Sequence, residues 1–231
     1  SIELSQIVSD SNFLVIGGQT GCGKTILLNK FDNSLDLEGY ANHRGSAFGN
    51  NVTPQPKQID FENHLIIDLI KKEYYENLLI EDEGNNIGTI FIPEVIKVKA
   101  RESKIIILRA SIEERIQISL KAYVIDMIKK FTDQDPINGA DNFSNYWFGS
   151  LFKIKKRLGG VRYDLLLNQL NIALKNHKEN NDLSDFFPLI ESLLVDYYDP
   201  MYDFQISNKK QRVIYEGNFH EVTNFLQEFK S

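Results

Sequence analysis

Short runs of apolar residues alternate along this chain with longer stretches in which apolar residues recur every three or four positions. The short runs predict buried strands, and they cover residues 13–16, 34–38, 78–80, 104–108 and 212–215. The longer stretches predict helices, among them one over residues 25–31 and one that follows Pro54 and Pro56. Strands that alternate with helices favour a parallel sheet covered on both faces.

The region after the fourth predicted strand is rich in helical signals. Ser111 with Glu114 three residues later predicts a capped helix, and helical spacing continues from residue 141 to about residue 199 with a break at Gly159. A last strand then precedes a helix that ends near Lys230. We therefore expect a P-loop NTPase-like α/β fold with five parallel strands, a core over 1–140, a helical insertion over 141–205, and a last strand and helix over 206–231.

Composition narrows the class of protein. The 231 residues are 42% hydrophobic and 25% charged, as in ordinary soluble globular proteins, and one cysteine excludes a disulfide framework and a multi-cysteine metal site. No apolar run approaches the length of a membrane span, and residues 1–10 lack a secretion signal, so we expect a cytoplasmic protein. The net charge of −6 argues against a uniformly basic surface but allows a local basic patch.

The strongest chemical signal is the run 18–25, which matches the phosphate-binding pattern G-x-x-x-x-G-K-[ST] between a predicted strand and a predicted helix. Backbone N–H groups of such a loop point inward, Lys24 reaches the terminal phosphates, and the Thr25 hydroxyl is a ligand for magnesium. The predicted phosphate-binding residues are Gln19, Thr20, Gly21, Cys22, Gly23, Lys24 and Thr25.

A magnesium ion in a phosphate loop usually needs a second acidic group at the end of a strand. Asp82, flanked by Glu81 and Glu83, follows an apolar strand and is the first candidate, with Asp36 and Glu38 as competitors. The alternative is that these acids are solvated turn residues. The sequence thus predicts a metal site made by Thr25 with Asp82 or Asp36.

A long loop and a basic helix add further candidates. His43 and Arg44 lie in the loop 39–53, near the carboxyl ends of the strands, where His43 would transfer a proton and Arg44 would pair with a phosphate. Residues 143–163 contain no acidic residue, and basic and aromatic residues are interleaved along them. This composition suits binding to an RNA backbone and its unpaired bases, and equally an amphipathic helix with its aromatics in the core. The basic candidates for RNA binding are Arg44, Lys153, Lys155, Lys156, Arg157 and Arg162, and of the aromatics we expect Trp147 and Phe152 in the core.

Several longer segments of the sequence resemble the C-terminal part of proteins of the tRNA 2-selenouridine synthase family. Besides the phosphate loop, these segments cover residues 35–39, 41–49, 55–56 with 61–62, 80–83 with 87–88 and Pro93, 156–160, and 196–202. The resemblance runs from about Phe13 to the C-terminus. It implies action on the wobble 2-thiouridine of tRNA, with selenophosphate as selenium donor and geranyl diphosphate as donor of a geranyl group.

The resemblance also implies roles and partners. Lys24, Arg44 and His43 become catalytic candidates, and both donors carry phosphate for the loop without a need for ATP or GTP hydrolysis. Family members commonly begin with a rhodanese-like domain whose cysteine serves the selenium step. No such sequence precedes Ser1 here and Cys22 is not that cysteine, so we expect either an excised domain or one half of a split enzyme. The expected partners are a rhodanese-like domain or subunit and tRNA, and neither DNA nor a membrane.

Two other function classes remain open at this point. The phosphate loop alone favours an ATP- or GTP-dependent kinase or NTPase, and the basic helix alone would suit a tRNA-binding module without chemistry of its own.

Overall fold

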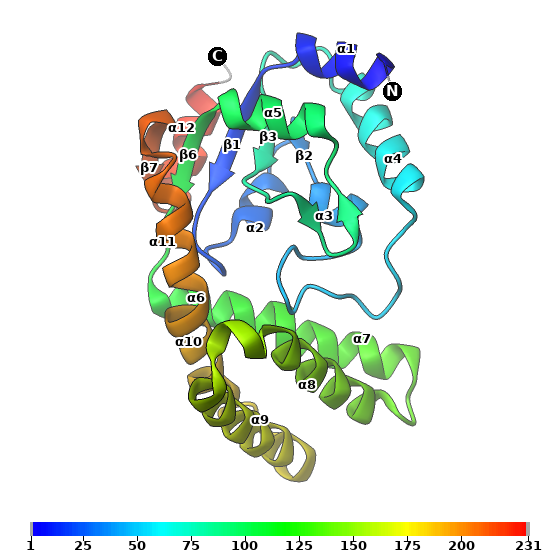
Figure 1. The fold of residues 1–231 in the computed structure, drawn as a ribbon, viewed down its shortest axis with the longest axis vertical. Helices are drawn as coiled ribbons and strands as arrows, with labels where there is room; N and C mark the ends of the chain where they lie inside the picture. The colour runs from blue at the N-terminus through cyan, green and yellow to red at the C-terminus, as the bar shows by residue number, and fades with distance from the viewer. Residues whose placement is uncertain (1, 230–231) are drawn as a thin grey trace.

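The chain forms a parallel five-stranded sheet with helices on both faces. The computed structural model describes residues 2–229, so the predicted helix end at Lys230 lies outside the described residues. The strands are β1 (Phe13–Gly17), β2 (Ser34–Leu35), β3 (Leu78–Glu81), β6 (Lys104–Leu108) and β7 (Val213–Gly217), in the order β2-β3-β1-β6-β7 (Figure 1). All four neighbouring pairs are parallel, which confirms the predicted fold class.

Alternation along the buried strands divides the apolar residues between the two faces of the sheet. One face packs on α2 (Lys24–Leu28) and α12 (Phe219–Glu228), and the other on α1 (Ile2–Asp10), α4 (Gln58–Lys71) and α5 (Glu94–Glu102). The strand residues of the first face are Leu14, Ile16, Leu79, Ile106 and Leu108, and those of the second are Phe13, Val15, Leu78, Ile80, Ile105 and Ile107. Both faces are therefore covered, as the continuous apolar runs predicted.

The second strand is shorter than the sequence predicted. It ends at Leu35, because the Asp36 carboxylate accepts a hydrogen bond from Gly39 N (2.8 Å) and caps the short helix α3 (Leu37–Tyr40). The last strand begins at Val213 rather than Arg212. Helix α1 and the small antiparallel hairpin of β4 (Asn86–Ile87) and β5 (Ile90–Phe91) were not predicted.

A helical block joins β6 to β7. It consists of α6 (Ile112–Leu120), α7 (Asp126–Gln134), α8 (Gly139–Leu158), α9 (Gly160–Asn180), α10 (Phe186–Leu193) and α11 (Asp199–Ser207). Two π-helical segments, η1 (Lys121–Ile125) and η2 (Leu194–Tyr198), join α6 to α7 and α10 to α11, and a 3₁₀ turn, η3 (Lys210–Arg212), leads into β7. The predicted capping box of Ser111 and Glu114 begins α6, and Gly159 separates α8 from α9.

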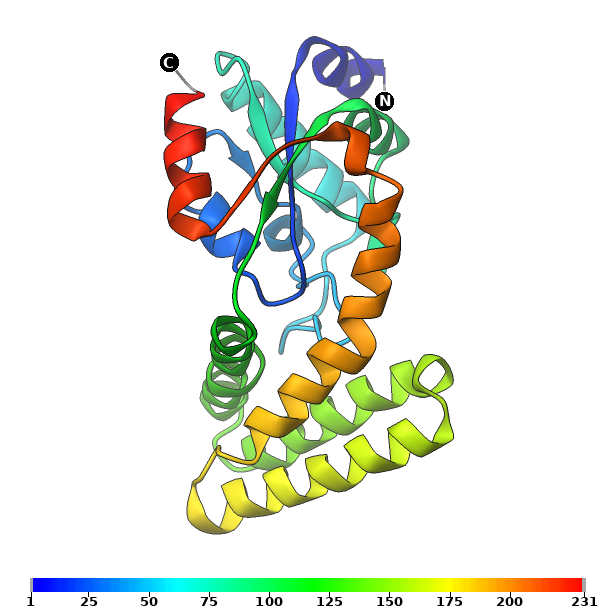
Figure 2. The same cartoon turned by 90° about the vertical axis from the view of Figure 1, so that its left-hand side faces the viewer.

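The helical block has a hydrophobic core of its own. Residues of α6, η1 and α7 pack with α8, α9 and α10 around Trp147 and Phe186, so the predicted insertion 141–205 shares its core with the helix that precedes it. Figure 2 shows α8 and α9 at the end of the molecule far from the sheet, while α10 and α11 run back toward it. The block therefore faces the carboxyl ends of the strands, where the phosphate loop lies.

A buried arginine connects the helical block to the phosphate loop. Arg115 on α6 donates two hydrogen bonds to the Asp199 carboxylate at the start of α11 (2.6 and 3.0 Å) and a third to Thr20 O (2.9 Å). Both charged side chains are largely removed from water. Three segments far apart in the sequence are held by one guanidinium.

We expect Asp199→Ala to reduce the free energy of unfolding by about 3–5 kcal/mol, because it leaves the buried Arg115 charge without a carboxylate to pair with. Urea denaturation measures this change. Asp133→Ala, which breaks the exposed Lys129–Asp133 pair, is the matched control and should cost less than about 1 kcal/mol. Equal losses in the two variants would contradict a structural role for the buried pair.

Candidate functional site

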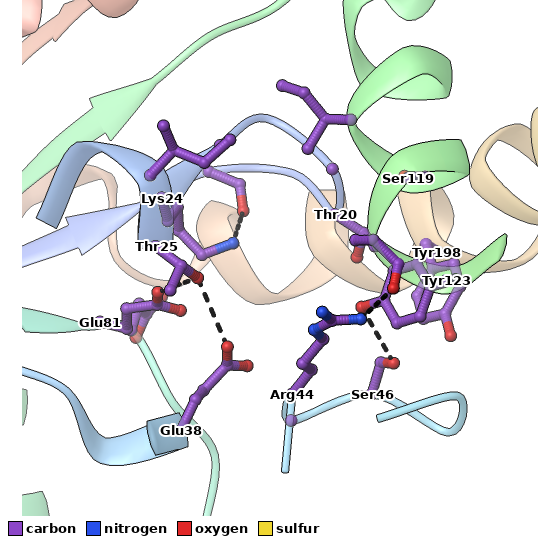
Figure 3. A pocket seen from close by; sticks show the side chains of 18 of the residues that line it. Thr20, Lys24, Thr25, Glu38, Arg44, Ser46, Glu81, Ser119, Tyr123 and Tyr198 are labelled. Carbon is purple, nitrogen blue, oxygen red and sulfur yellow. Dashed lines mark hydrogen bonds between the residues drawn. The ribbon is translucent and has the colours of Figure 1, made fainter. Parts of the chain in front are cut away.

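A cavity of about 1080 Å³ lies between the phosphate loop and the helical block. Its floor is formed by six residues of the phosphate loop, and its opposite wall by α6, η1, η2 and α11 (Figure 3). The loop 41–57 supplies Arg44, Gly45 and Ser46. The cavity thus opens at the carboxyl edge of a parallel sheet, the usual ligand position in this architecture.

The phosphate loop has the backbone that its glycines permit. Gly18, Gly21 and Gly23 all have positive φ, and Gly23 is the residue directly before α2. Lys24 Nζ donates to Gly18 O (3.1 Å) and points along the cavity floor in Figure 3. Burial lowers the pKa of Lys24, but the nearby Cys22 and Glu81, Glu83 and Glu38 groups outweigh it and raise that pKa, so the ammonium keeps its charge.

Two of the predicted loop residues do not face the cavity. Gln19 and Cys22 are absent from its lining, and Cys22 N donates to Gln19 O (3.2 Å) within the loop. The Cys22 side chain is 2% exposed, and burial raises the pKa of its thiol. The structure therefore gives Cys22 a packing position, in which the thiol is a poor nucleophile.

Three carboxylates converge beside the loop threonine. Glu38, Glu81 and Glu83 each place an oxygen within 4.8 Å of the others. Thr25 Oγ1 donates to Glu81 Oε1 (2.7 Å) and lies 3.4 Å from Glu38 Oε2. Burial, and then the mutual repulsion of the carboxylates, raises the pKa of Glu38 to about 9 and that of Glu83 to about 8. This acid triad and Thr25 offer the hard oxygen ligands that magnesium prefers.

Both aspartates of the predicted metal site have other partners, although Asp82 also lines the cavity. Both Asp82 oxygens accept hydrogen bonds from Lys209 Nζ (2.7 Å each), since neighbouring side chains at the end of β3 point to opposite sides. Asp36 caps α3 instead. Glu81, Glu83 and the competitor Glu38 are the acids that face Thr25.

The loop 39–53 separates its two predicted catalytic residues. Arg44 lies in the cavity wall, donates to Ala122 O in η1, and stands 5.5 Å from the centre of the Tyr123 ring. His43 is only 6% exposed, its Nε2 bonds Asn50 Oδ1 (3.1 Å), and it does not line the cavity. Burial lowers the pKa of His43. The geometry therefore places Arg44 at the site and removes His43 from it.

The basic residues of α8 and α9 form an exposed surface outside the cavity. Lys153, Lys155, Lys156, Arg157 and Arg162 are all exposed, whereas Trp147 is buried as predicted. The prediction that Phe152 lies in the core is wrong, because its ring is 64% exposed. It lies on the side of α8 opposite the buried stripe of Leu151, Ile154 and Leu158.

The sequence did not identify the cavity residues of the helical block. Ser119, Tyr123, Tyr198 and Tyr202 face the loop across the cavity. Ser119 and Tyr123 carry only their position on a helix as a signal, which does not distinguish a cavity from a core. Tyr198 and Tyr202 lie in the segment 196–202 that carries part of the family resemblance, but no role at the site was predicted for them.

The fold and the loop define a class, the P-loop α/β proteins. The family model described as "tRNA 2-selenouridine synthase AAA domain" matches residues 11–231. The tRNA 2-selenouridine synthase of Sulfurovum sp. (strain NBC37-1) is 40% identical over 230 residues, and that of Pseudomonas aeruginosa (strain LESB58) is 42% identical over 224. The chain belongs to the tRNA 2-selenouridine synthase family.

The matches cover nearly all of this chain but only part of each relative. They span 99% and 96% of the chain, against 63% of the Sulfurovum protein and 61% of the Pseudomonas protein. The chain thus spans about three fifths of the length of the curated relatives it matches. Among the described residues, no helix is both long enough and apolar enough to cross a bilayer.

In the presence of a chelator, we expect the stability of the protein to fall as the pH rises from about 4.5 to about 8–9. The lower limit is the ordinary pKa of glutamate, and the upper limit is the pH at which Glu83 and Glu38 ionise in the folded protein. Over this range the native state holds protons that the unfolded chain has released, so unfolding becomes easier with rising pH. Melting temperatures at several pH values measure the loss.

Glu38→Gln is the matched variant, because it removes one titrating group and relieves the repulsion in the acid triad. Its melting temperature should fall less over the same pH range, and magnesium should reduce the loss in the wild type. If the melting temperatures of the wild type and Glu38→Gln fell equally with rising pH, the raised pKa values of the acid triad would be contradicted.

Proposed function

We propose that this chain is the phosphate-binding part of a tRNA-modifying enzyme, and that its cavity binds the (di)phosphate of a donor, geranyl diphosphate or selenophosphate, next to the wobble 2-thiouridine of tRNA. The observation that carries this proposal is the open cavity in which the loop, Lys24 and Arg44 face a common space. The printed names of the relatives, which are tRNA 2-selenouridine synthases, support tRNA and selenium as the context.

The lining of the cavity suits a donor that combines charge with an apolar group. Ile118, Ile125 and Met201 line it together with three tyrosines, opposite the charged loop, and Ile26 lines it directly after the loop. A phosphate on the loop would leave an attached hydrocarbon near these side chains, whose contact with it is favourable. This combination favours geranyl diphosphate over a purely polar ligand.

The charges of the site support a requirement for a divalent cation. The acid triad places three carboxylates beside Lys24, so ionised acids would repel an incoming diphosphate. Thr25, Glu38, Glu81 and Glu83 are the residues that would hold magnesium. A bound magnesium ion would neutralise the acids and stabilise negative charge on the phosphate oxygens.

The chain's own cations would assist the transfer step. In geranyl transfer, the thiouridine sulfur attacks the first carbon of the geranyl group, the carbon–oxygen bond breaks, and its electron pair leaves on diphosphate. Lys24 and Arg44 would stabilise that charge, which is larger in the transition state than in the bound donor. We propose that exchange of sulfur for selenium additionally needs a rhodanese-like domain or subunit.

We expect Lys24→Ala to reduce geranyl transfer to thiolated tRNA by at least about 100-fold without unfolding the protein, because the ammonium stabilises the leaving group. Product formation with geranyl diphosphate measures the loss, and the melting temperature reports the fold. Lys30→Ala, at an exposed position two residues beyond the end of the same helix, is the control. Unchanged transfer in Lys24→Ala would remove the loop from the mechanism.

The same assay with ATP separates the other function classes. The contact of Thr25 with Glu81 at the end of β3 is also compatible with a nucleotide phosphate and its metal ion, which favours a kinase or NTPase as the second candidate. Release of ADP without alkylated tRNA would support that candidate. Binding of tRNA without either product would indicate a tRNA-binding module.

The basic surface of α8 and α9 is the proposed tRNA contact. Phe152 and Lys156 lie one helical turn apart, so an exposed ring stands beside exposed positive charge, a combination that suits base stacking and phosphate pairing.

We expect the double variant Lys156→Ala/Arg157→Ala to bind tRNA more weakly and with a salt dependence reduced by about one to two phosphate contacts, because each cation releases counterions on binding. Fluorescence anisotropy over a salt series measures both. Lys71→Ala/Lys104→Ala removes two exposed cations at the other end of the molecule and should leave binding unchanged. Equal effects of the two double variants would contradict this surface.

A further inference from the structure

Two hydroxyl groups in the cavity wall have no hydrogen-bond partner among the described residues. They are Ser119 Oγ on α6 and the Tyr202 hydroxyl on α11, and both oxygen atoms are shielded from solvent. Ser119 as a residue is 3% exposed. A buried hydroxyl without a partner costs free energy, so such groups in a native protein call for an explanation.

Both groups belong to the wall that faces the phosphate loop. A Cβ atom placed on Gly21 would stand 2.6 Å from Ser119 Oγ, so this hydroxyl lies directly against the loop backbone. Figure 3 shows Ser119 on the side of the cavity across from Lys24. Tyr202 also lines the cavity, and Lys24 and Cys22 of the loop act on its ionisation.

Two other polar groups on this side of the loop already have partners. The Arg115 guanidinium is engaged by Asp199 and Thr20 O, and the Tyr123 hydroxyl accepts from Ser46 Oγ (3.3 Å). Burial is the main cause that raises the pKa of Tyr202 to about 12, so its phenol stays protonated near neutral pH. Both unpartnered groups are therefore neutral hydrogen-bond donors.

We propose that Ser119 and Tyr202 donate hydrogen bonds to the phosphate group held by the P-loop, so that the anion is bound from the sheet side and from the helical block at once. This inference rests on the proposed phosphate binding and deepens it. The two residues position the donor and contribute no charge. An anion bound in this way also connects α6 and α11 to the core.

The experiment compares Ser119→Ala and Tyr202→Phe with the wild type for binding of inorganic diphosphate in the presence of magnesium, by calorimetry. We expect each variant to bind about tenfold more weakly, as for the loss of one hydrogen bond to a charged group. Without ligand, both variants should melt at the wild-type temperature or above it, because they remove a hydroxyl that has no partner.

Ser150→Ala is the matched control, since Ser150 is a second buried serine of the helical block, 2% exposed, and does not line the cavity. It should leave diphosphate binding unchanged. A structural role for Ser119 and Tyr202 would instead lower the melting temperature of the free protein and leave the affinity unchanged.

Lys24→Ala separates this inference from the proposed function. Wild-type affinity in both hydroxyl variants, together with lost binding in Lys24→Ala, would overturn the inference and leave the P-loop site standing. Absence of diphosphate binding by the wild type would overturn both.

Discussion

The buried guanidinium of Arg115 determines how the two halves of this molecule face each other. It joins α6 to Asp199 on α11 and to the backbone of the phosphate loop at Thr20. Because a buried charge is tolerated only when its hydrogen bonds are satisfied, these three segments must keep their relative positions. The width of the cavity between loop and helical block follows from this constraint.

The charges within the cavity are divided between two sides. The acid triad and Thr25 lie on the sheet side, and Arg44 reaches in from the loop 41–57. Because the carboxylates are crowded and largely removed from water, the pKa values of Glu38 and Glu83 are raised. A site of this kind binds an anion well only when protons or a cation compensate the acids.

The sequence predicted the architecture well and the site in part. The five strands and the phosphate loop follow from local signals, namely apolar runs and a motif whose residues are contiguous. Asp82 was chosen over Glu81 and Glu83, although residues two apart on an extended segment point the same way, and this alternation would have favoured the two glutamates. Phe152 was expected in the core because its place relative to the buried stripe of α8 was misjudged.

By itself, the sequence determined which segments become the five parallel strands and which loop carries the phosphate-binding pattern, because these depend on neighbours along the chain. Only the tertiary structure decided that Glu38 joins Glu81 and Glu83, that His43 is removed from the cavity while Arg44 enters it, and that Ser119 and Tyr202 face Gly21 and Lys24. These contacts join residues that are far apart in sequence. They depend on how the helical block packs over the sheet, and no local pattern encodes that packing.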